Sequence, residues 1–386
     1  MSAETSAEIV DTNTGLWNLT ARMPTGFVPG PNPWTAKLED GYFLVAGGFN
    51  SFNTGNLASS YIYSVASNSW IRTGDLPVGA TMGSNFSQTD SVVLDDGRVL
   101  VAGGLTIGLG ASTASMVFTP NYANLGSGAS GAAVGSWDFT RDKAGHVTTL
   151  SGATEHHKLI KLLDGRVLVI VGFDRIYASA KYGTVYRDTP GVQAELFDPK
   201  SGTWTPLPNM PAIRGEDDQH DGVKGVRQQA AVALSGDGRV LITGGFSEPT
   251  DAQGRPLLKQ GLYVRASVIV FDPYLFDAGV YPWLITAPMR VARHSHAMSN
   301  LPGSAGIISV WGWTTNGWTA TAEIYDSRQG IWKSAASMPA LQGTNSAVSQ
   351  PWGCSATMPS GDMLIAGGIR DAEVGGTSRH TYTYQP

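Results

Sequence analysis

One phrase, read as L-x-D-G-x-x-L-V-x-G-G, recurs along almost the whole chain and limits the folds that it can adopt. Each copy predicts an apolar strand, a tight Asp-Gly turn, a second strand, and a glycine pair at which the backbone bends or packs closely. Clear copies lie at 38–48, 94–104, 162–172, 235–245 and 359–368, and a weaker copy lies at 301–312. Six copies in one order indicate a repeat architecture, which a single Asp-Gly turn would not.

Each copy is followed by a third strand with an aromatic residue, a turn, and in most cases a tryptophan. The tryptophans are Trp70, Trp137, Trp204, Trp283 and Trp332. Four short strands per unit, with Gly-Gly and aromatic–Trp marks, resemble the kelch repeat, which forms one blade of a β-propeller. The resemblance covers nearly the whole chain and implies an all-β fold, a six-bladed kelch-type β-propeller. The alternative is a glycine-rich β-sandwich with accidental turns.

The two ends of the chain complete each other in this interpretation. Residues 11–24 read as a Trp-bearing fourth strand with no preceding partners, and residues 379–386 read as a third strand with no fourth strand after it. We therefore expect the N-terminal fourth strand to complete the last blade and close the ring, which pairs the exposed strand edges. The expected organisation is a mobile N-terminus at 1–10 and a single domain at 11–386.

Composition excludes several classes of protein. The net charge is −5, which argues against a nucleic-acid partner, and no apolar run approaches the length of a membrane span. A hydrophobic content of 42% with only 15% charged residues excludes a disordered chain. The single cysteine, Cys354, cannot form an internal disulfide, so we expect a cytoplasmic protein. The opening residues lack signal-peptide features, although a leader removed earlier would leave no trace.

The histidines and the long loops predict one functional face. In a propeller the loops between strands 2 and 3, and between strand 4 and the next strand 1, share a face. The long loops 141–157, 173–193, 210–229 and 246–267 belong to that face, where function usually resides. All seven histidines fall in such loops or at the adjoining strand ends: His146, His156, His157, His220, His294, His296 and His380.

The starts of the first strands should meet at the mouth of the central channel, and their residues are mostly polar. This convergence predicts a small-molecule site. The expected catalytic residues are His156, His294, His296, Glu155 and His157. The expected substrate-binding residues are Arg227, Arg293, Gln228, Trp34, Trp352, Asp90 and Cys354. The alternative is that these groups hydrogen-bond one another and water, and that one histidine of each pair packs between blades.

Two clusters carry more specific predictions. His294 and His296 lie two apart on an expected strand, so both should point to the same side and suit acid/base chemistry or a metal. Glu216, Asp218 and His220 alternate in the same way and are the candidate ligands of a divalent metal. A solvated acidic loop is the alternative for this second cluster. The sequence requires no cofactor.

Three kelch families were compared with these motifs. The iron-binding spacing of nitrile-specifier proteins and the Tyr-His strand of copper oxidases similar to galactose oxidase are absent. In plan the chain is similar to bacterial N-acetylneuraminate epimerases, but no catalytic motif of theirs matches residue by residue. We expect a stand-alone enzyme of epimerase, lyase or cyclase type that acts on a small polar or part-aromatic molecule. The alternative is a non-catalytic module that binds a protein or a carbohydrate, for which Trp311, Trp313, Trp318 and Trp352 are candidate contacts.

Overall fold

A computed structural model describes the chain in segments, and the chain divides into two compact units, residues 1–207 and 208–386. The described residues are 8–10, 14, 16–24, 33–47, 49–51, 55–56, 58–77, 90–106, 110–154, 157–170, 194–213, 227–247, 262–301, 306–337, 354–357, 363–366 and 381–384.

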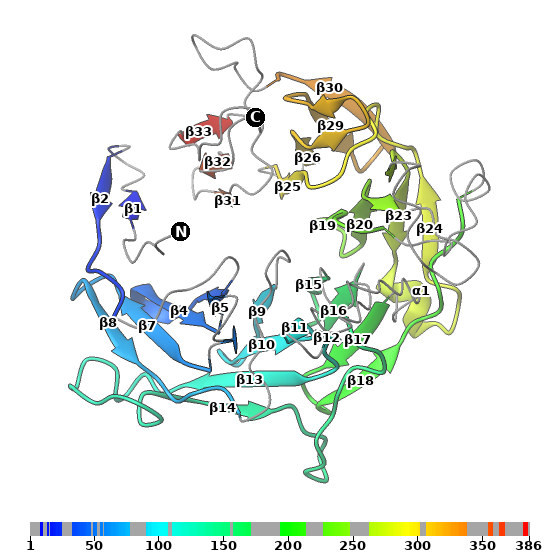
Figure 1. The fold of residues 1–386 in the computed structure, drawn as a ribbon. Coiled ribbons are helices and arrows are strands. Elements are labelled where there is room, and N and C mark those ends of the chain that lie inside the picture. The colour runs from blue at the N-terminus through cyan, green and yellow to red at the C-terminus, as the bar shows by residue number, and fades with distance from the viewer. Residues whose placement is uncertain are drawn as a thin grey trace, which may run out of the picture. The chain divides into compact units, whose positions relative to one another are not determined.

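The first unit contains three four-stranded antiparallel sheets, in which the strands follow chain order (Figure 1). The first sheet is β3 (Trp34–Lys37), β4 (Tyr42–Ala46), β7 (Ser60–Ser64) and β8 (Ser69–Arg72). The second is β9 (Ser91–Val93), β10 (Val99–Ala102), β13 (Ser115–Pro120) and β14 (Gly135–Phe139). The third is β15 (Lys158–Lys161), β16 (Val167–Ile170), β17 (Ala194–Asp198) and β18 (Thr203–Pro206).

The second unit repeats this plan. The fourth sheet is β19 (Ala231–Leu234), β20 (Val240–Thr243), β23 (Val268–Phe271) and β24 (Trp283–Thr286). The fifth is β25 (Ala297–Asn300), β26 (Ile307–Val310), β29 (Ala322–Asp326) and β30 (Ile331–Ala335). The sixth has three described strands, β31 (Cys354–Thr357), β32 (Met363–Ala366) and β33 (Thr381–Tyr384).

Five two-stranded hairpins and one short α-helix accompany these sheets in the described segments. Two-stranded hairpins follow the second strands of four sheets, and another lies at the N-terminus: β5 (Phe49–Ser51) with β6 (Gly55–Asn56), β11 (Leu105–Thr106) with β12 (Gly110–Ala111), β21 (Phe246–Ser247) with β22 (Tyr263–Val264), β27 (Trp313–Thr314) with β28 (Gly317–Trp318), and β1 (Glu8–Val10) with β2 (Trp17–Leu19). Helix α1 spans Pro273–Asp277 and is capped by the Asp272 carboxylate. No helix in the described segments is long and apolar enough to cross a membrane.

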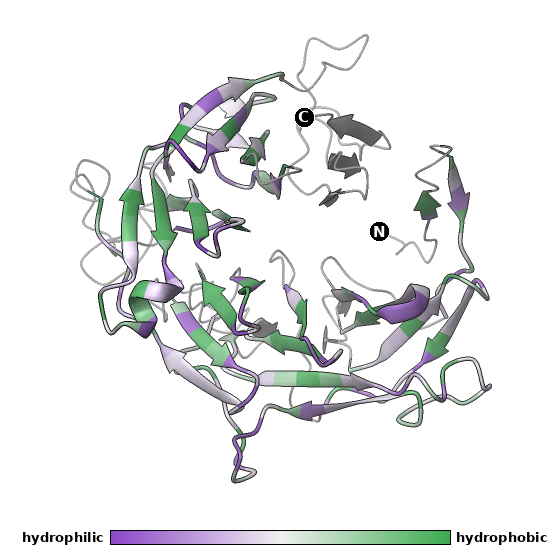
Figure 2. Ribbon diagram, turned by 180° about the vertical axis from the view of Figure 1, so that it is seen from behind, coloured by the Kyte–Doolittle hydropathy of each residue, from purple (hydrophilic) through white to green (hydrophobic). Residues whose placement is uncertain are grey.

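Consecutive sheets within a unit share apolar cores, to which their second strands contribute (Figure 2, hydrophobic residues in green). In β10, Val99 and Val101 pack with the first sheet, whereas Leu100 and Ala102 pack with the third. Every residue of β10, β16, β20 and β26 is buried. A second strand that is apolar along most of its length is therefore the sequence signature of a strand buried on both faces.

The aromatic residue of each third strand faces the tryptophan of the fourth strand. Five directly opposed pairs have ring centroids 4.9–5.2 Å apart: Tyr63–Trp70, Phe118–Trp137, Phe197–Trp204, Phe271–Trp283 and Tyr325–Trp332. Opposed aromatic side chains stabilise an antiparallel pair beyond the area that they bury. These pairs explain why the tryptophans recur at the same place in each repeat.

The Asp-Gly turns between the first and second strands are also built alike. Asp96, Asp164 and Asp237 each accept a hydrogen bond from the backbone N–H of the arginine two residues later and pair with its guanidinium. This contact lowers the pKa of Asp96 and of Asp164 against the opposing effect of burial. The turns are thus closed by their own side chains.

The prediction of an all-β chain made of repeated antiparallel sheets is confirmed. Strand β2 pairs with β1, whereas the sequence predicted no preceding partner for the N-terminal strand. Closure of a six-bladed ring, the single domain at 11–386 and the mobile end at 1–10 stay predictions.

The tryptophans offer a matched test of this scaffold. Trp70 and Trp204 are both half-buried and both stack on a third-strand aromatic, but only Trp70 Nε1 has a hydrogen-bond partner in the described segments, the carbonyl oxygen of Ala21 at 2.9 Å. Trp70→Phe should therefore lower the free energy of unfolding by about 1 kcal/mol more than Trp204→Phe. Urea unfolding of both variants measures the difference. Equal losses would contradict a role for the Ala21 bond.

Candidate functional site

Several residues predicted for the site lie outside the described segments. These are Glu155, His156 and Trp352, together with the whole metal candidate set of Glu216, Asp218 and His220. For Cys354 the structure gives the backbone only, at the start of β31 opposite Ala366. Among the described residues, no group of three His, Cys, Asp or Glu side chains could hold a metal ion. The predicted metal site therefore stays a prediction.

Two predicted substrate contacts have structural partners. Trp34 is 1% exposed and packs 6.4 Å from the ring of Trp137, inside the core between the first and second sheets. Asp90 accepts a hydrogen bond from the backbone N–H of Leu159 at 3.3 Å and lies 3.4 Å from Lys158 Nζ, so it links the second sheet to the third. These contacts give Trp34 a packing role and Asp90 a sheet-linking role.

The residues that precede the first strands of the third, fourth and fifth sheets form equivalent segments, which we call pre-strand segments: 154–157, 227–230 and 293–296. Each pre-strand segment ends one residue before the first strand begins. The first residue of that strand pairs with the last residue of the second strand. In the third and fifth sheets, the first residue of this segment accepts a hydrogen bond from the second glycine of the preceding sheet. Gly104 donates to the Thr154 carbonyl at 2.8 Å, and Gly245 donates to the Arg293 carbonyl at 3.0 Å.

Arg227 and Arg293 occupy the same position and make the same contacts. Each guanidinium bridges two carbonyls of its own sheet, one directly after the second strand and one directly before the third, and also bonds a hydroxyl. The acceptors are Gly244 O, Ser267 O and Ser267 Oγ for Arg227, and Trp311 O, Thr321 O and Thr321 Oγ1 for Arg293, at 2.5–3.1 Å. Both residues are at most 1% exposed. These donors hold the sheet together, and the expected substrate-binding role of both arginines stays a prediction.

Arg293 also pairs with the buried carboxylate of Glu323, 2.7 Å from its Nη2. Glu323 in turn accepts hydrogen bonds from the backbone N–H groups of Arg290 and Val291, which precede the fifth sheet. A buried ion pair of this kind is tolerated only when its remaining polar atoms are satisfied. Glu323 thereby fastens the link between the fourth and fifth sheets to the third strand of the fifth.

His157 and His296 are equivalent residues that pack against the preceding sheet. A Cβ atom added to Gly103 would lie 2.7 Å from Cε1 of His157, and one added to Gly244 would lie 3.0 Å from Cε1 of His296. His296 Nε2 also lies 2.7 Å from Thr243 Oγ1 at the end of β20. Of the two alternatives for these histidines, the structure supports packing between sheets. Their predicted catalytic role stays a prediction.

His294 differs from both. Strand β25 begins at Ala297, and Ser295 has a φ of 52°, so the expectation that His294 and His296 lie on one extended strand and point to the same side is wrong. Gln229 has the equivalent place in the fourth sheet and a φ of 54°. The His294 ring packs 4.7 Å from Phe246, and its Nδ1 lies 2.9 Å from Ser295 Oγ and 3.2 Å from Gln229 Oε1.

These contacts fix the tautomer of His294. The Ser295 hydroxyl donates its only proton to Gln229 Oε1 in a short contact, so it can only accept from His294 Nδ1. With the Gln229 carbonyl oxygen in this position, Nδ1 carries the proton and Nε2 keeps its lone pair. Among the described residues Nε2 has no hydrogen-bond partner, and it is buried. His294 is therefore an oriented base whose Nε2 lone pair has no hydrogen-bond donor among the described residues.

Burial keeps all three imidazoles neutral. It lowers the pKa of His294 to about 4 and that of His157 to about 4, and it lowers the pKa of His296 well below 6.5 with further help from Arg293 and His294. For His157 the nearby Asp90 and the Ala102 backbone act in the opposite direction. At neutral pH His294 can accept a proton or a hydrogen bond, and it is no permanent positive charge.

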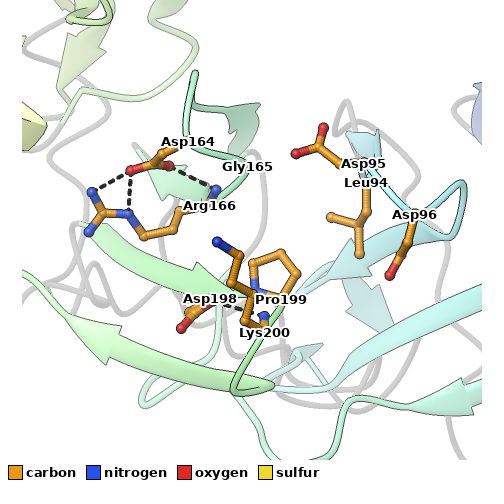
Figure 3. Close-up of a pocket in the computed structure, with 9 residues that line it drawn as sticks. All are labelled: Leu94, Asp95, Asp96, Asp164, Gly165, Arg166, Asp198, Pro199 and Lys200. Carbon is orange, nitrogen blue, oxygen red and sulfur yellow. Dashed lines mark hydrogen bonds and ion pairs between the residues drawn. The ribbon is translucent and has the colours of Figure 1, made fainter.

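A separate cavity of about 530 Å³ lies on the turns of the second and third sheets (Figure 3). Its carboxylates already have partners: Asp95 pairs with Lys161, Asp96 with Arg98, Asp164 with Arg166, and Asp198 accepts from the Lys200 backbone. It lies on the Asp-Gly turns between the first and second strands of these sheets and on the turn after β17. Local turn closure accounts for its charges.

Sequence reasoning missed four members of these networks. They are Gln229, Ser295, Glu195 and Glu323. A signal was present for the glutamates, because a third strand beginning Ala-Glu appears in only two repeats and puts a carboxylate where the other repeats have different side chains. No comparable signal marked Gln229 or Ser295, whose part depends on a left-handed backbone.

Comparison with known proteins adds no relative. No protein-family model matches the sequence, and a search of curated proteins finds no significant match.

The buried histidines predict an acid-sensitive fold. The pKa of His157 is about 4 in the folded chain, whereas an unfolded histidine titrates near 6.5, so the unfolded chain takes up its proton first as the pH falls. This residue should lower the free energy of unfolding by up to about 3 kcal/mol between pH 7 and pH 4, with most of the loss below pH 6.5. His157→Gln should make the pH dependence over this range shallower by that amount, as measured by urea unfolding. An unchanged slope would show that His157 is not a buried neutral group.

Proposed function

We propose that the six sheets are the blades of a kelch-type propeller closed by β2. Tryptophan Nε1 hydrogen bonds support this. Trp283 donates to Pro208 O, four residues after Trp204, and Trp332 donates to Ala287 O, four residues after Trp283. Trp70 donates to Ala21 O, four residues after Trp17. Trp17 thus has the position of the fourth-strand tryptophan in a blade that precedes the first sheet.

We propose that this strand, β2, is the fourth strand of the sixth sheet. Tyr384 pairs with Met363, the register position that the third-strand aromatic holds in the other five sheets. Alignment of Trp17 with Tyr384, as Trp70 aligns with Tyr63, would place Asn18 opposite Thr383. Strand β1 would then lie on the outer edge of β2 and leave its other edge for β33.

A disulfide tests this register. In a Cys354→Ser background, Asn18→Cys with Thr383→Cys should oxidise to an intramolecular disulfide in high yield, because directly opposed antiparallel residues have Cα atoms about 4.5–5.5 Å apart. Mass spectrometry of the non-reduced chain measures the yield. The control pair Asn18→Cys with Thr381→Cys should remain reduced under the same conditions. Equal yields would contradict the pairing.

We further propose that the chain is an enzyme of epimerase, lyase or cyclase type that acts on a small polar or part-aromatic molecule, with His294 as the acid/base group. The observation that carries this is the fixed tautomer of His294 with an unengaged Nε2. A general base must be neutral before it reacts and oriented by a second group, and Ser295 with Gln229 supplies the orientation. Uptake of the substrate's proton at Nε2 would create an imidazolium, whose Nδ1–H still donates to the same two side chains.

Two features shape this reaction. Nε2 is buried, so a substrate must displace the side chains that cover it before proton transfer. The low pKa of His294 means that the base stays unprotonated down to about pH 4, and a bound anion would raise its proton affinity. The predicted roles of Glu155 and His156 as further acid/base groups stay open, since both lie outside the described segments.

A non-catalytic binding module is the second candidate, and Trp313 with Trp318 favours it. These half-buried residues oppose each other across the β27–β28 hairpin, with ring centroids 4.0 Å apart at 81°. Trp313 also exchanges both backbone hydrogen bonds with His294, so its side chain shares a face with that histidine. Aromatic faces of this kind suit sugar rings or a protein anchor. Trp311, in contrast, is 2% exposed and belongs to the core.

Deuterium exchange tests the enzyme. The protein is incubated in D₂O with a panel of reducing sugars, amino sugars, uronic acids and 2-oxo acids, and loss of C–H signals is followed by ¹H NMR. We expect one compound class to exchange with the wild type and to slow at least about 100-fold with His294→Gln. His146→Gln, at an exposed loop residue paired with Asp142, should retain the wild-type rate. Exchange that His294→Gln leaves unchanged would overturn the assignment, and binding without exchange would favour the module.

A further inference from the structure

Glu195 and Glu323 are equivalent residues in two repeats of the same chain. Each lies two residues before the third-strand aromatic, Phe197 or Tyr325, and each is at most 2% exposed. Among the six sheets, only the third and fifth have glutamate at this place. The two carboxylates therefore form a natural comparison.

The same backbone amides position both carboxylates. Glu195 Oε1 accepts from the N–H of Ser151 at 2.8 Å, three residues before Thr154. Glu323 Oε2 accepts from the N–H of Arg290 at 2.6 Å, three residues before Arg293. The segments that donate are held alike as well, because Thr154 N–H bonds Ser112 O and Arg293 N–H bonds Arg265 O, both at 3.1 Å.

The two sites differ at the position that Arg293 occupies in the fifth sheet. Arg293 directs its guanidinium at Glu323, whereas the equivalent residue in the third sheet is Thr154, which is too short to do so. Glu195 Oε2 and Thr154 Oγ1 are buried and have no hydrogen-bond partner among the described residues. Burial raises the pKa of Glu195 against the opposing effect of the Ser151 and Gly152 amides, as expected for a carboxylate without a cation.

We propose that the third sheet binds an organic cation, a guanidinium or primary ammonium group of a ligand, beside Glu195 and Thr154, in the place that the Arg293 side chain takes in the fifth sheet. A buried carboxylate with a free oxygen is costly unless a donor meets it. In the fifth sheet the donor is a guanidinium, which satisfies the carboxylate and a hydroxyl together.

The chemistry favours an organic cation over a metal ion. The acceptors are one carboxylate and one hydroxyl, and no metal-binding group of three His, Cys, Asp or Glu side chains occurs in the described segments. A divalent metal ion takes more charged or carbonyl oxygen ligands than this. A planar guanidinium is the group that meets the equivalent carboxylate, Glu323, in the fifth sheet.

Guanidinium ion is the direct probe. Thermal unfolding of the full chain is followed by calorimetry with low-millimolar guanidinium chloride, and sodium chloride keeps the ionic strength constant. We expect a saturable rise of about 2–4 °C in the unfolding midpoint of the wild type. Glu195→Gln should lose the rise. A rise that persists in Glu195→Gln, or an equal rise with sodium chloride alone, would overturn the proposal.

Two reciprocal variants sharpen the test. Thr154→Arg supplies the guanidinium from the chain, so it should raise the midpoint without any additive and abolish the response to guanidinium. Arg293→Thr recreates the third-sheet arrangement in the fifth sheet, so it should lower the midpoint and add a second guanidinium response. If Thr154→Arg fails to fold, Glu195→Gln and Arg293→Thr still decide the question. A wild-type-like response in Arg293→Thr would count against the equivalence of the two sites.

Discussion

The close approach of a glycine to the next sheet is the contact on which this structure depends. Gly103 and Gly244 have φ values of 63° and 58°, and an added Cβ would overlap the pre-strand segment that follows. Only glycine allows both the left-handed turn and this distance. The second glycine of each of these two pairs, Gly104 or Gly245, then donates its N–H to that segment, so both pairs end one strand and anchor the next sheet.

This contact explains why the polar side chains of the pre-strand segments have structural partners. A pre-strand segment pressed against a neighbouring sheet needs its polar groups satisfied without water. Arg227 and Arg293 do this for the carbonyls at the ends of two strands, and His296 does it for Thr243. A charged or imidazole side chain at such a place fills space and bonds backbone together. A polar residue type at the start of a first strand is therefore weak evidence for catalysis.

The sequence predicted the strands well because their signals are local. Asp-Gly turns, apolar second strands and the aromatic–Trp pairs depend on residues a few positions apart, and Trp137 and Phe118 meet as that pattern requires. The contacts around the site could not be predicted in the same way, because their geometry depends on other sheets and on backbone conformation. A φ of 52° at Ser295 turns His294 away from the direction that simple alternation predicts, and nothing in the sequence around His294 indicates that turn.

Repetition makes departures from the pattern informative. A residue that all repeats share is explained by packing, whereas a residue that breaks the pattern needs its own reason. Trp311 has a φ of 46° at a place where four of the other five repeats have glycine, yet its burial in the core of the fifth sheet offsets that strain. Glu195 has no such compensation, since the arginine that neutralises its counterpart is replaced by threonine. His294 is the other exception, because its ring nitrogen is oriented but not engaged. The functional positions in a repeat protein are best sought where the repeat is locally incomplete.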